Sequence, residues 1–171
     1  MDQFLIFFIA MVFGVASTWI TRFFALKAGI VNAPNPIIPQ HRKPVAYLGG
    51  VGVFGGIFFG LLYCWFFQRS YIDKLLNTNL PSWSLIIGAV GCLVLGIFDD
   101  LMALKARTKF AWQFVIAVVC VILGLRTNLF ASPFLDYLIS VFWIATVINA
   151  LNFTDVCDGL VGTICVATFL T

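Results

Sequence analysis

The chain has 171 residues, of which 62% are hydrophobic and only 10% are charged, and its mean hydropathy is +1.06. So few polar residues cannot cover a folded core, which excludes a soluble globular protein. The net charge of +3 says little by itself, and we expect no nucleic-acid partner. The composition predicts an all-α protein, a polytopic helix bundle in a membrane.

Six apolar runs provide the expected helices. A helix needs about 20 residues to cross the hydrocarbon of a bilayer, with about 17 as the lower limit. The third and fourth runs must therefore borrow flanking residues, and the sixth is too short as it stands. We predict five full transmembrane helices and a truncated sixth in a single domain, 1–171, and we expect the native chain to continue past Thr171. The runs are 4–26, 48–67, 83–98, 110–125, 134–151 and 160–171.

The basic residues indicate how the chain is oriented in the membrane. They are concentrated in the connections after the first and third runs, whereas the connections after the second and fourth runs hold fewer. The positive-inside rule then places the first, third and fifth connections in the cytoplasm and the N-terminus outside. Three loops on one membrane face can therefore form one site. The first group is Lys27, Arg42, Lys43, Lys105, Arg107 and Lys109, and the second is Arg69, Lys74 and Arg126.

Four of the seven acidic residues lie in two short clusters at the ends of apolar runs, and the chain has no glutamate. Asp99 and Asp100 end the third run, and Asp155 and Asp158 follow the fifth. Charge is costly beside hydrocarbon, so acids at this boundary indicate chemistry more than stability. Adjacent carboxylates repel each other at a helix C-terminus, so Asp99 and Asp100 need a cation or a basic partner. The alternative is a pair of ordinary interfacial residues that bind the basic residues that follow.

The second cluster belongs to the segment Asn149-Ala-Leu-Asn152-Phe-Thr-Asp155-Val-Cys-Asp158-Gly159-Leu160. Its polar residues recur every three positions, and a helix would bring Asn149, Asn152 and Asp155 within about 120° of one another. Carboxylate and amide oxygens are hard ligands that suit Mg²⁺ rather than zinc. A polar helix cap would account for only one of these residues, so the segment predicts a magnesium site.

The first connection, residues 27–46, holds four of the six prolines and cannot be helical throughout. It also holds the only histidine, His41, beside Arg42 and Lys43. Two interpretations stay open for this loop. It is either a solvated basic loop that sets topology, or a cationic patch that binds a phosphate.

Small residues in the apolar runs are expected to pack helices together. Gly52, Gly56 and Gly60 repeat every four residues and form a smooth stripe that lets another helix approach closely. A phosphate cradle is the alternative, but such loops follow a strand, and none is expected here. The five cysteines are scattered without a CxxC pair, which predicts neither disulfides nor a thiolate metal site.

Three blocks of sequence together resemble one family of membrane enzymes. The blocks are Gly96-Ile-Phe-Asp99-Asp100, the segment from Asn149 to Leu160, and Pro34-Asn35 with His41 and Pro44-Val-Ala-Tyr-Leu-Gly49-Gly50. They are similar to the bacterial polyprenyl-phosphate N-acetylhexosamine-1-phosphate transferases, of the glycosyltransferase family 4 type. The N-acetylglucosamine (GlcNAc) branch is more similar than the MurNAc-pentapeptide branch, which is kept as an alternative.

The resemblance implies transfer of a sugar 1-phosphate from a UDP-N-acetylhexosamine to undecaprenyl phosphate, with release of UMP. This would be the first membrane step of cell-envelope polysaccharide synthesis, such as lipopolysaccharide or cell-wall polymers, at the cytoplasmic face of the bacterial inner membrane. Mg²⁺, or Mn²⁺ in its place, would assist. The expected roles are catalytic for Asp99 and Asp100, metal-binding for Asn152, Asp155 and Asp158, and substrate-binding for Asn149, Lys105 and His41.

The family also has a later metal-binding aspartate and a histidine-rich loop, which would lie beyond Thr171. We therefore expect the front half of the site, and no catalysis by the 171 residues alone. A homodimer is left open. Two other classes remain: a transporter with boundary acids along an ion path, and a CDP-alcohol phosphatidyltransferase. The first predicts internal repeats, which the sequence lacks, and the second predicts a single compact acidic cluster.

Overall fold

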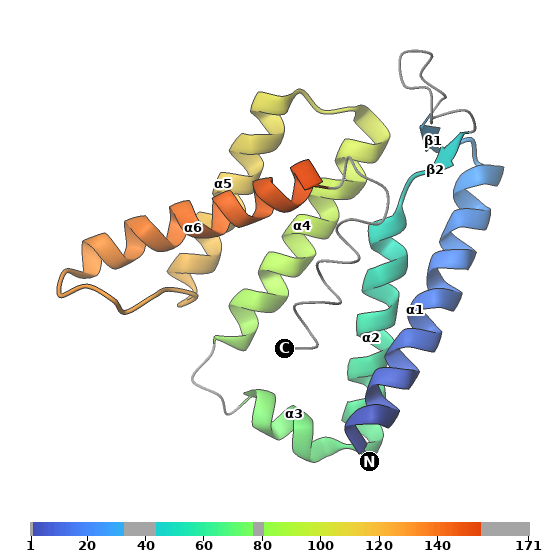
Figure 1. Ribbon diagram of the computed structural model, residues 1–171, viewed down its shortest axis with the longest axis horizontal. Helices are drawn as coiled ribbons and strands as arrows, with labels where there is room; N and C mark the ends of the chain where they lie inside the picture. Colours follow the sequence, from blue (N-terminus) through green and yellow to red (C-terminus); the bar gives the residue numbers. More distant parts are fainter. Residues whose placement is uncertain (1, 33–43, 77–80, 155–171) are drawn as a thin grey trace. The chain divides into compact units, whose positions relative to one another are not determined.

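The computed structural model describes residues 2–32, 44–76 and 81–154, and this part of the chain is helical apart from short connections and two very short strands (Figure 1). The prediction of an all-α helical membrane protein is confirmed as a fold class. In chain order the elements are α1 (Asp2–Lys27), β1 (Val31–Asn32), β2 (Val45–Ala46), α2 (Gly49–Phe67), α3 (Arg69–Leu76), α4 (Ser82–Met102), α5 (Ala106–Ile122) and α6 (Pro133–Thr154).

Four helices in the described residues are long and apolar enough to cross a membrane: Phe4–Lys27, Gly49–Phe67, Ser82–Met102 and Pro133–Phe153. They correspond to the first, second, third and fifth apolar runs. The fourth run forms α5, whose 17 residues are at the lower limit for a span. The sixth run lies outside the described residues, so five spans and a truncated sixth stay a prediction.

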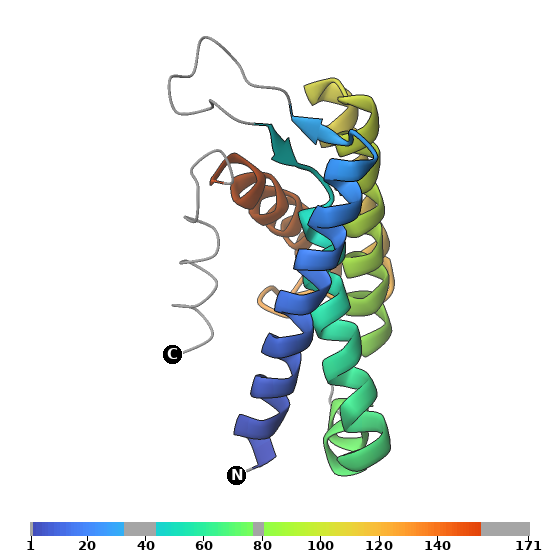
Figure 2. The same ribbon diagram turned by 90° about the vertical axis from the view of Figure 1, so that its right-hand side faces the viewer.

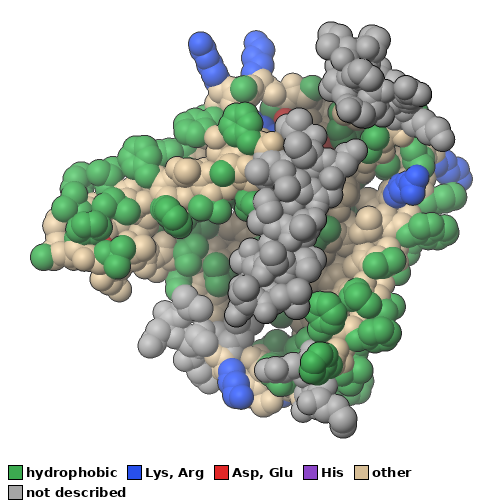
Figure 3. Space-filling model, in the orientation of Figure 1, with side chains coloured by type: hydrophobic (Ala, Val, Ile, Leu, Met, Phe, Trp, Pro, Cys, Tyr) green, Lys and Arg blue, Asp and Glu red, His purple; other side chains and the backbone are tan. Residues whose placement is uncertain are grey.

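Large apolar side chains lie mainly on the surface of the helices. Phe4 is 81% exposed and Phe134 is 72% exposed, whereas the buried residues are mostly small, such as Ala25 and Ala117. Figure 3 shows this apolar cover over α6 and over α1. Such a distribution is expected where hydrocarbon replaces water as the solvent, because large apolar side chains gain little by leaving lipid and small residues let helices pack closely.

The described residues form two compact units, and the single-domain prediction stays a prediction. Of the described residues, one unit comprises 2–32, 44–76, 81–82 and 93–104, and the other comprises 83–92 and 105–154. Helix α4 contributes its first half to the second unit and its second half to the first.

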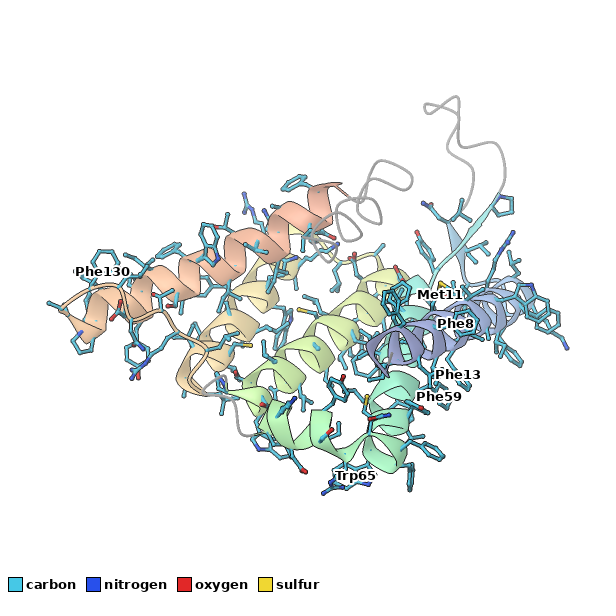
Figure 4. All side chains as sticks on the ribbon, turned by 60° about the horizontal axis from the view of Figure 1, so that its bottom comes forward. Phe8, Met11, Phe13, Phe59, Trp65 and Phe130 are labelled. Atoms are coloured by element: carbon cyan, nitrogen blue, oxygen red, sulfur yellow. The ribbon has the colours of Figure 1, made fainter. Side chains whose placement is uncertain are left out.

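In the first unit, α1 and α2 lie side by side (Figure 2) and pack through the predicted glycine stripe. A Cβ atom on Gly56 would lie 2.7 Å from the Cα of Gly14, and one on Gly52 would lie 2.5 Å from the Cα of Thr18. The Phe13 ring of α1 stacks on the Phe59 ring of α2 at 4.7 Å (Figure 4). The prediction of close helix packing is therefore confirmed.

A short ladder closes the base of the first loop. Helix α1 ends at Lys27, and Gly29 takes a φ of +72°, which lets the Ile30 N–H bond the Ala25 carbonyl at 2.9 Å. Strands β1 and β2 then pair antiparallel, with Val31 opposite Ala46. No strand was expected before the glycines of α2, and that expectation is wrong. The ladder brings the two ends of the loop together immediately before α2.

In the second unit, the first half of α4 packs against α5, and α5 packs against α6. The Cys120 thiol donates to the Ser84 carbonyl at 3.6 Å, and the Phe114 and Phe142 rings meet edge to face. Cys120 is buried, as expected for a small packing residue. The connection from α5 to α6 is held by Asp136, which accepts from two of its backbone N–H groups.

Candidate functional site

Asp99 and Asp100 lie in the last turn of α4, at the predicted C-terminal end of an apolar helix, and both are partly buried. The helix is closed by Ala103, which has a φ of 48° and a ψ of 65°. The Ala103 N–H donates to the Asp99 carbonyl at 2.9 Å. This left-handed conformation is usual for glycine at a helix end, so the alanine is strained there. The backbone around the acidic pair is thus held in a specific, strained turn.

The Asp100 carboxylate contacts the beginning of α2. Its Oδ2 accepts a hydrogen bond of 2.8 Å from the Leu48 N–H, across 52 residues of sequence. Leu48 is the N-cap of α2 and has a φ of 67° and a ψ of 22°. The first N–H groups of a helix have no acceptor within the helix and carry partial positive charge. The sequence indicated that these acids need a cation or a basic partner. For Asp100, the partial positive charge at the N-terminus of α2 provides such a partner.

This bond also joins the first loop to the acidic pair. Leu48 follows β2 by two residues, and the Tyr47 N–H between them donates to the Ile30 carbonyl at 3.2 Å. The base of the first loop is therefore fixed to the end of α4. His41, which the sequence places in that loop, lies outside the described residues.

Asn149 and Asn152 lie one helical turn apart near the end of α6, so the helix expected there is confirmed. Asn149 is partly buried and Asn152 is exposed. The expected continuation of this face, Asp155, and the last acid, Asp158, both lie outside the described residues. Both asparagines belong to the second unit, whereas Asp99 and Asp100 belong to the first.

Lys105 is the N-cap of α5, five residues after Asp100, and its side chain is exposed. Arg107 and Lys109 follow in the first turn, and no acidic residue lies in that turn. Basic side chains at a helix N-terminus gain nothing from the helix dipole, which favours anions there. The concentration of positive charge at this point suits a phosphate group.

The donor atoms predicted for a metal are of the type that Mg²⁺ prefers, because all are carboxylate or amide oxygens. Over residues 2–32, 44–76 and 81–154, no group of three or more His, Cys, Asp or Glu residues lies close enough to hold a metal ion. The chemistry of the proposed ligands therefore fits magnesium, and two of the three, Asp155 and Asp158, lie outside this part of the chain.

The comparisons with known proteins agree with the family that the motifs indicated. Residues 82–171, more than half of the chain, match the model of glycosyl transferase family 4. No solved structure matches the chain.

Among curated proteins, the chain is 32% identical over 152 residues to a probable undecaprenyl-phosphate N-acetylglucosaminyl 1-phosphate transferase of Bacillus subtilis, covering 84% of this chain and 39% of the relative. It is 25% identical to the undecaprenyl-phosphate alpha-N-acetylglucosaminyl 1-phosphate transferase of Yersinia pestis, covering 92% and 42%. It is 28% identical to the decaprenyl-phosphate N-acetylglucosaminephosphotransferase of Mycolicibacterium smegmatis, covering 85% and 37%. The chain thus spans about two fifths of the length of these relatives. Given the match over more than half of its residues, the chain belongs to glycosyl transferase family 4.

Proposed function

We propose that this protein transfers GlcNAc 1-phosphate from UDP-GlcNAc to undecaprenyl phosphate and releases UMP. The observation that carries the proposal is the acidic pair Asp99-Asp100 at the end of an apolar helix, bonded to the base of the first loop. Family membership supports it, as do relatives whose names specify an N-acetylglucosaminyl 1-phosphate and an undecaprenyl phosphate.

The chemistry requires charge compensation more than a strong base. The acceptor is a phosphate monoester whose second pKa is about 6, so near neutral pH it is mostly a dianion. One of its oxygens bonds to the phosphorus that carries the sugar. The bond from that phosphorus to the oxygen of the UMP phosphate breaks, and UMP leaves with the electron pair. Two anionic groups must therefore be brought together in line, with their charge offset.

The residues divide this work. Asp99 and Asp100 form the acidic pair at the reacting groups, and Lys105, His41 and Asn149 bind the phosphates and the sugar nucleotide. Asn152, Asp155 and Asp158 would hold Mg²⁺ or Mn²⁺. When bound, such an ion offsets the negative charge of the diphosphate.

The same proposal includes the topology. The N-terminus lies outside, five helices and the start of a sixth span the bacterial inner membrane, and the site lies on the cytoplasmic face. The distribution of Lys27, Lys105, Arg107 and Lys109 supports this orientation.

The proposal is tested with the protein expressed from its complete reading frame and reconstituted in liposomes. We expect UMP release that requires both UDP-GlcNAc and undecaprenyl phosphate. Parallel assays offer UDP-MurNAc-pentapeptide, a CDP-lipid with an alcohol acceptor, and an ion gradient. Preference for the pentapeptide donor, release of CMP, or ion flux without transfer would each replace the proposal with one of its alternatives.

A further inference from the structure

We propose that Asp100 is a positioning residue, whose carboxylate holds Leu48 in its left-handed conformation and so fixes the base of the first loop at the acidic pair. The inference rests on the proposed transferase function, because Asp100 would position the base of the first loop beside the proposed active site. It refines the role given to the acidic pair above: Asp99 acts at the reacting groups, whereas Asp100 acts through its bond to Leu48.

The backbone of Leu48 shows why such a holding contact is needed. A leucine with a φ of 67° places its Cβ against its own backbone, and this conformation persists only where the surroundings impose it. Before Leu48, the Tyr47 N–H is bonded to Ile30, and after it, the Leu48 carbonyl accepts from the Val51 N–H at 3.1 Å. The Asp100 bond at 2.8 Å completes the set by taking the N–H of Leu48 itself.

Electrostatics favour a carboxylate for this contact. Asp100 lies at the C-terminal end of α4, where the helix dipole disfavours an anion, and its bond places it at the N-terminal end of α2, where the dipole favours one. A partly buried, charge-assisted hydrogen bond is stronger than a neutral one.

The helix also separates the two acids. Successive side chains on a helix point about 100° apart, so the Asp99 and Asp100 carboxylates leave α4 in different directions. The Asp99 carbonyl is held by the Ala103 N–H, which limits movement of the turn. Fixing Leu48 therefore sets where the base of the first loop, β1 and β2, lies relative to the end of α4 that carries Asp99.

The first test compares two substitutions at Asp100 in the protein from the complete reading frame. Asp100→Asn keeps an oxygen that can accept the Leu48 N–H, whereas Asp100→Ala removes the acceptor. We expect kcat for UMP release to fall about a hundred-fold in Asp100→Ala, as misplacement of a site can cause, and the Asn variant to retain at least about ten-fold more. Equal losses in both variants would show that the negative charge itself is required and would overturn the inference.

The second test changes the other side of the contact. Glycine adopts a positive φ without strain, so Leu48→Gly makes the turn independent of Asp100. We expect Leu48→Gly to raise kcat of the Asp100→Ala protein by about ten-fold, as in a coupled double-mutant cycle. The control is Ala103→Gly, which relieves the other left-handed residue and should not rescue Asp100→Ala. Absence of rescue by Leu48→Gly, or equal rescue by Ala103→Gly, would contradict the inference.

The unfolding temperature in detergent provides a readout that needs no substrate. We expect it to fall in Asp100→Ala and to recover in the double variant with Leu48→Gly. If the variants show this coupling but the wild-type protein releases no UMP, the proposed function is refuted and the contact between Asp100 and Leu48 is retained. A protein that releases UMP without the coupling would refute the positioning role alone.

Discussion

The place of Asp99 and Asp100 in the chain could be predicted from sequence, but the contact that Asp100 makes could not. Both were predicted from their place at the end of an apolar run, and the structure confirms that place. The bond from Leu48 to Asp100 could not be predicted, because it joins positions 52 residues apart and leaves no local pattern. Leu48 itself is a leucine in a conformation that sequence rules assign to glycine or asparagine. Turns of this kind break local propensity and are therefore missed.

At this scale we predict that Asp99→Asn lowers kcat for UMP release at least about a hundred-fold, in the range seen when one electrostatic group of a site is removed. Its unfolding temperature should stay within about 2 °C of wild type, since an amide of the same shape keeps the packing. The matched control is Asp73→Asn, an exposed acid of α3 that pairs with Arg69 at 3.5 Å. Near-normal turnover of Asp99→Asn, or an equal loss in the control, would assign Asp99 a structural role.

Ala103 offers a second test at the residue scale. Its φ of 48° costs free energy for any residue with a Cβ, and Ala103→Gly should raise the free energy of unfolding by about 0.5–1 kcal/mol. The same change at Ala150, exposed within α6, should lower it by about 1 kcal/mol, because glycine weakens a helix interior. Chemical unfolding in detergent measures both. Destabilisation by Ala103→Gly would show that the turn is not strained.

Helices and their packing faces could be predicted where a regular pattern extends over many residues. The spacing of Gly52, Gly56 and Gly60 predicted a packing face, and the structure places Thr18, Gly14 and Ala10 of α1 against it. The ladder of β1 and β2 was missed because two residues per strand give no alternation to recognise. Helix α5 begins four residues earlier than its apolar run, since Arg107, Thr108 and Lys109 are part of the helix. It ends three residues earlier, just before Gly124, which has a φ of 103°.

Gly56→Ala tests the packing of α1 on α2. The new Cβ would meet the Cα of Gly14 at 2.7 Å, and this backbone atom cannot rotate away as a side chain can. The helices must separate, which should cost about 1–3 kcal/mol of the free energy of unfolding. Gly96→Ala on α4 is the matched control, because no atom described here lies within 4 Å of its Cβ. Gly96→Ala should be neutral or stabilising, and a similar loss at both positions would mean that the stripe is not a close contact.

For the whole molecule, the sequence predicts that distant loops share one membrane face. The structure supports part of this arrangement, because the bond between Leu48 and Asp100 joins the first connection to the third. Composition was sufficient for the fold class, because so apolar a chain has few alternatives to membrane helices. The orientation depends on loop charges, which are a weaker physical signal, and it stays a prediction.

A cysteine-accessibility scan tests that orientation. In a variant with its native cysteines replaced, single cysteines near His41, Lys105 and Thr154 should react with an impermeant maleimide only from the cytoplasmic side. A cysteine at Ser70, exposed at the start of α3, should react only from the outside and serves as the opposite control. Labelling of the His41 and Lys105 positions from different sides would show that these two loops do not share one membrane face.

The proposed metal site would draw on residues from several of these loops, and its metal requirement can be measured directly. Chelation with EDTA should abolish UMP release, and added Mg²⁺ or Mn²⁺ should restore it. Asn152→Ala removes one uncharged oxygen from the proposed ligands, so we expect the Mg²⁺ concentration for half-maximal rate to rise about 10–100-fold, with activity recovered at high Mg²⁺. Asn149→Ala, one turn away on the same helix face, should instead raise KM for UDP-GlcNAc and leave the Mg²⁺ requirement within about three-fold of wild type. A shift in the Mg²⁺ requirement with Asn149→Ala but not with Asn152→Ala would move the metal one turn back along α6.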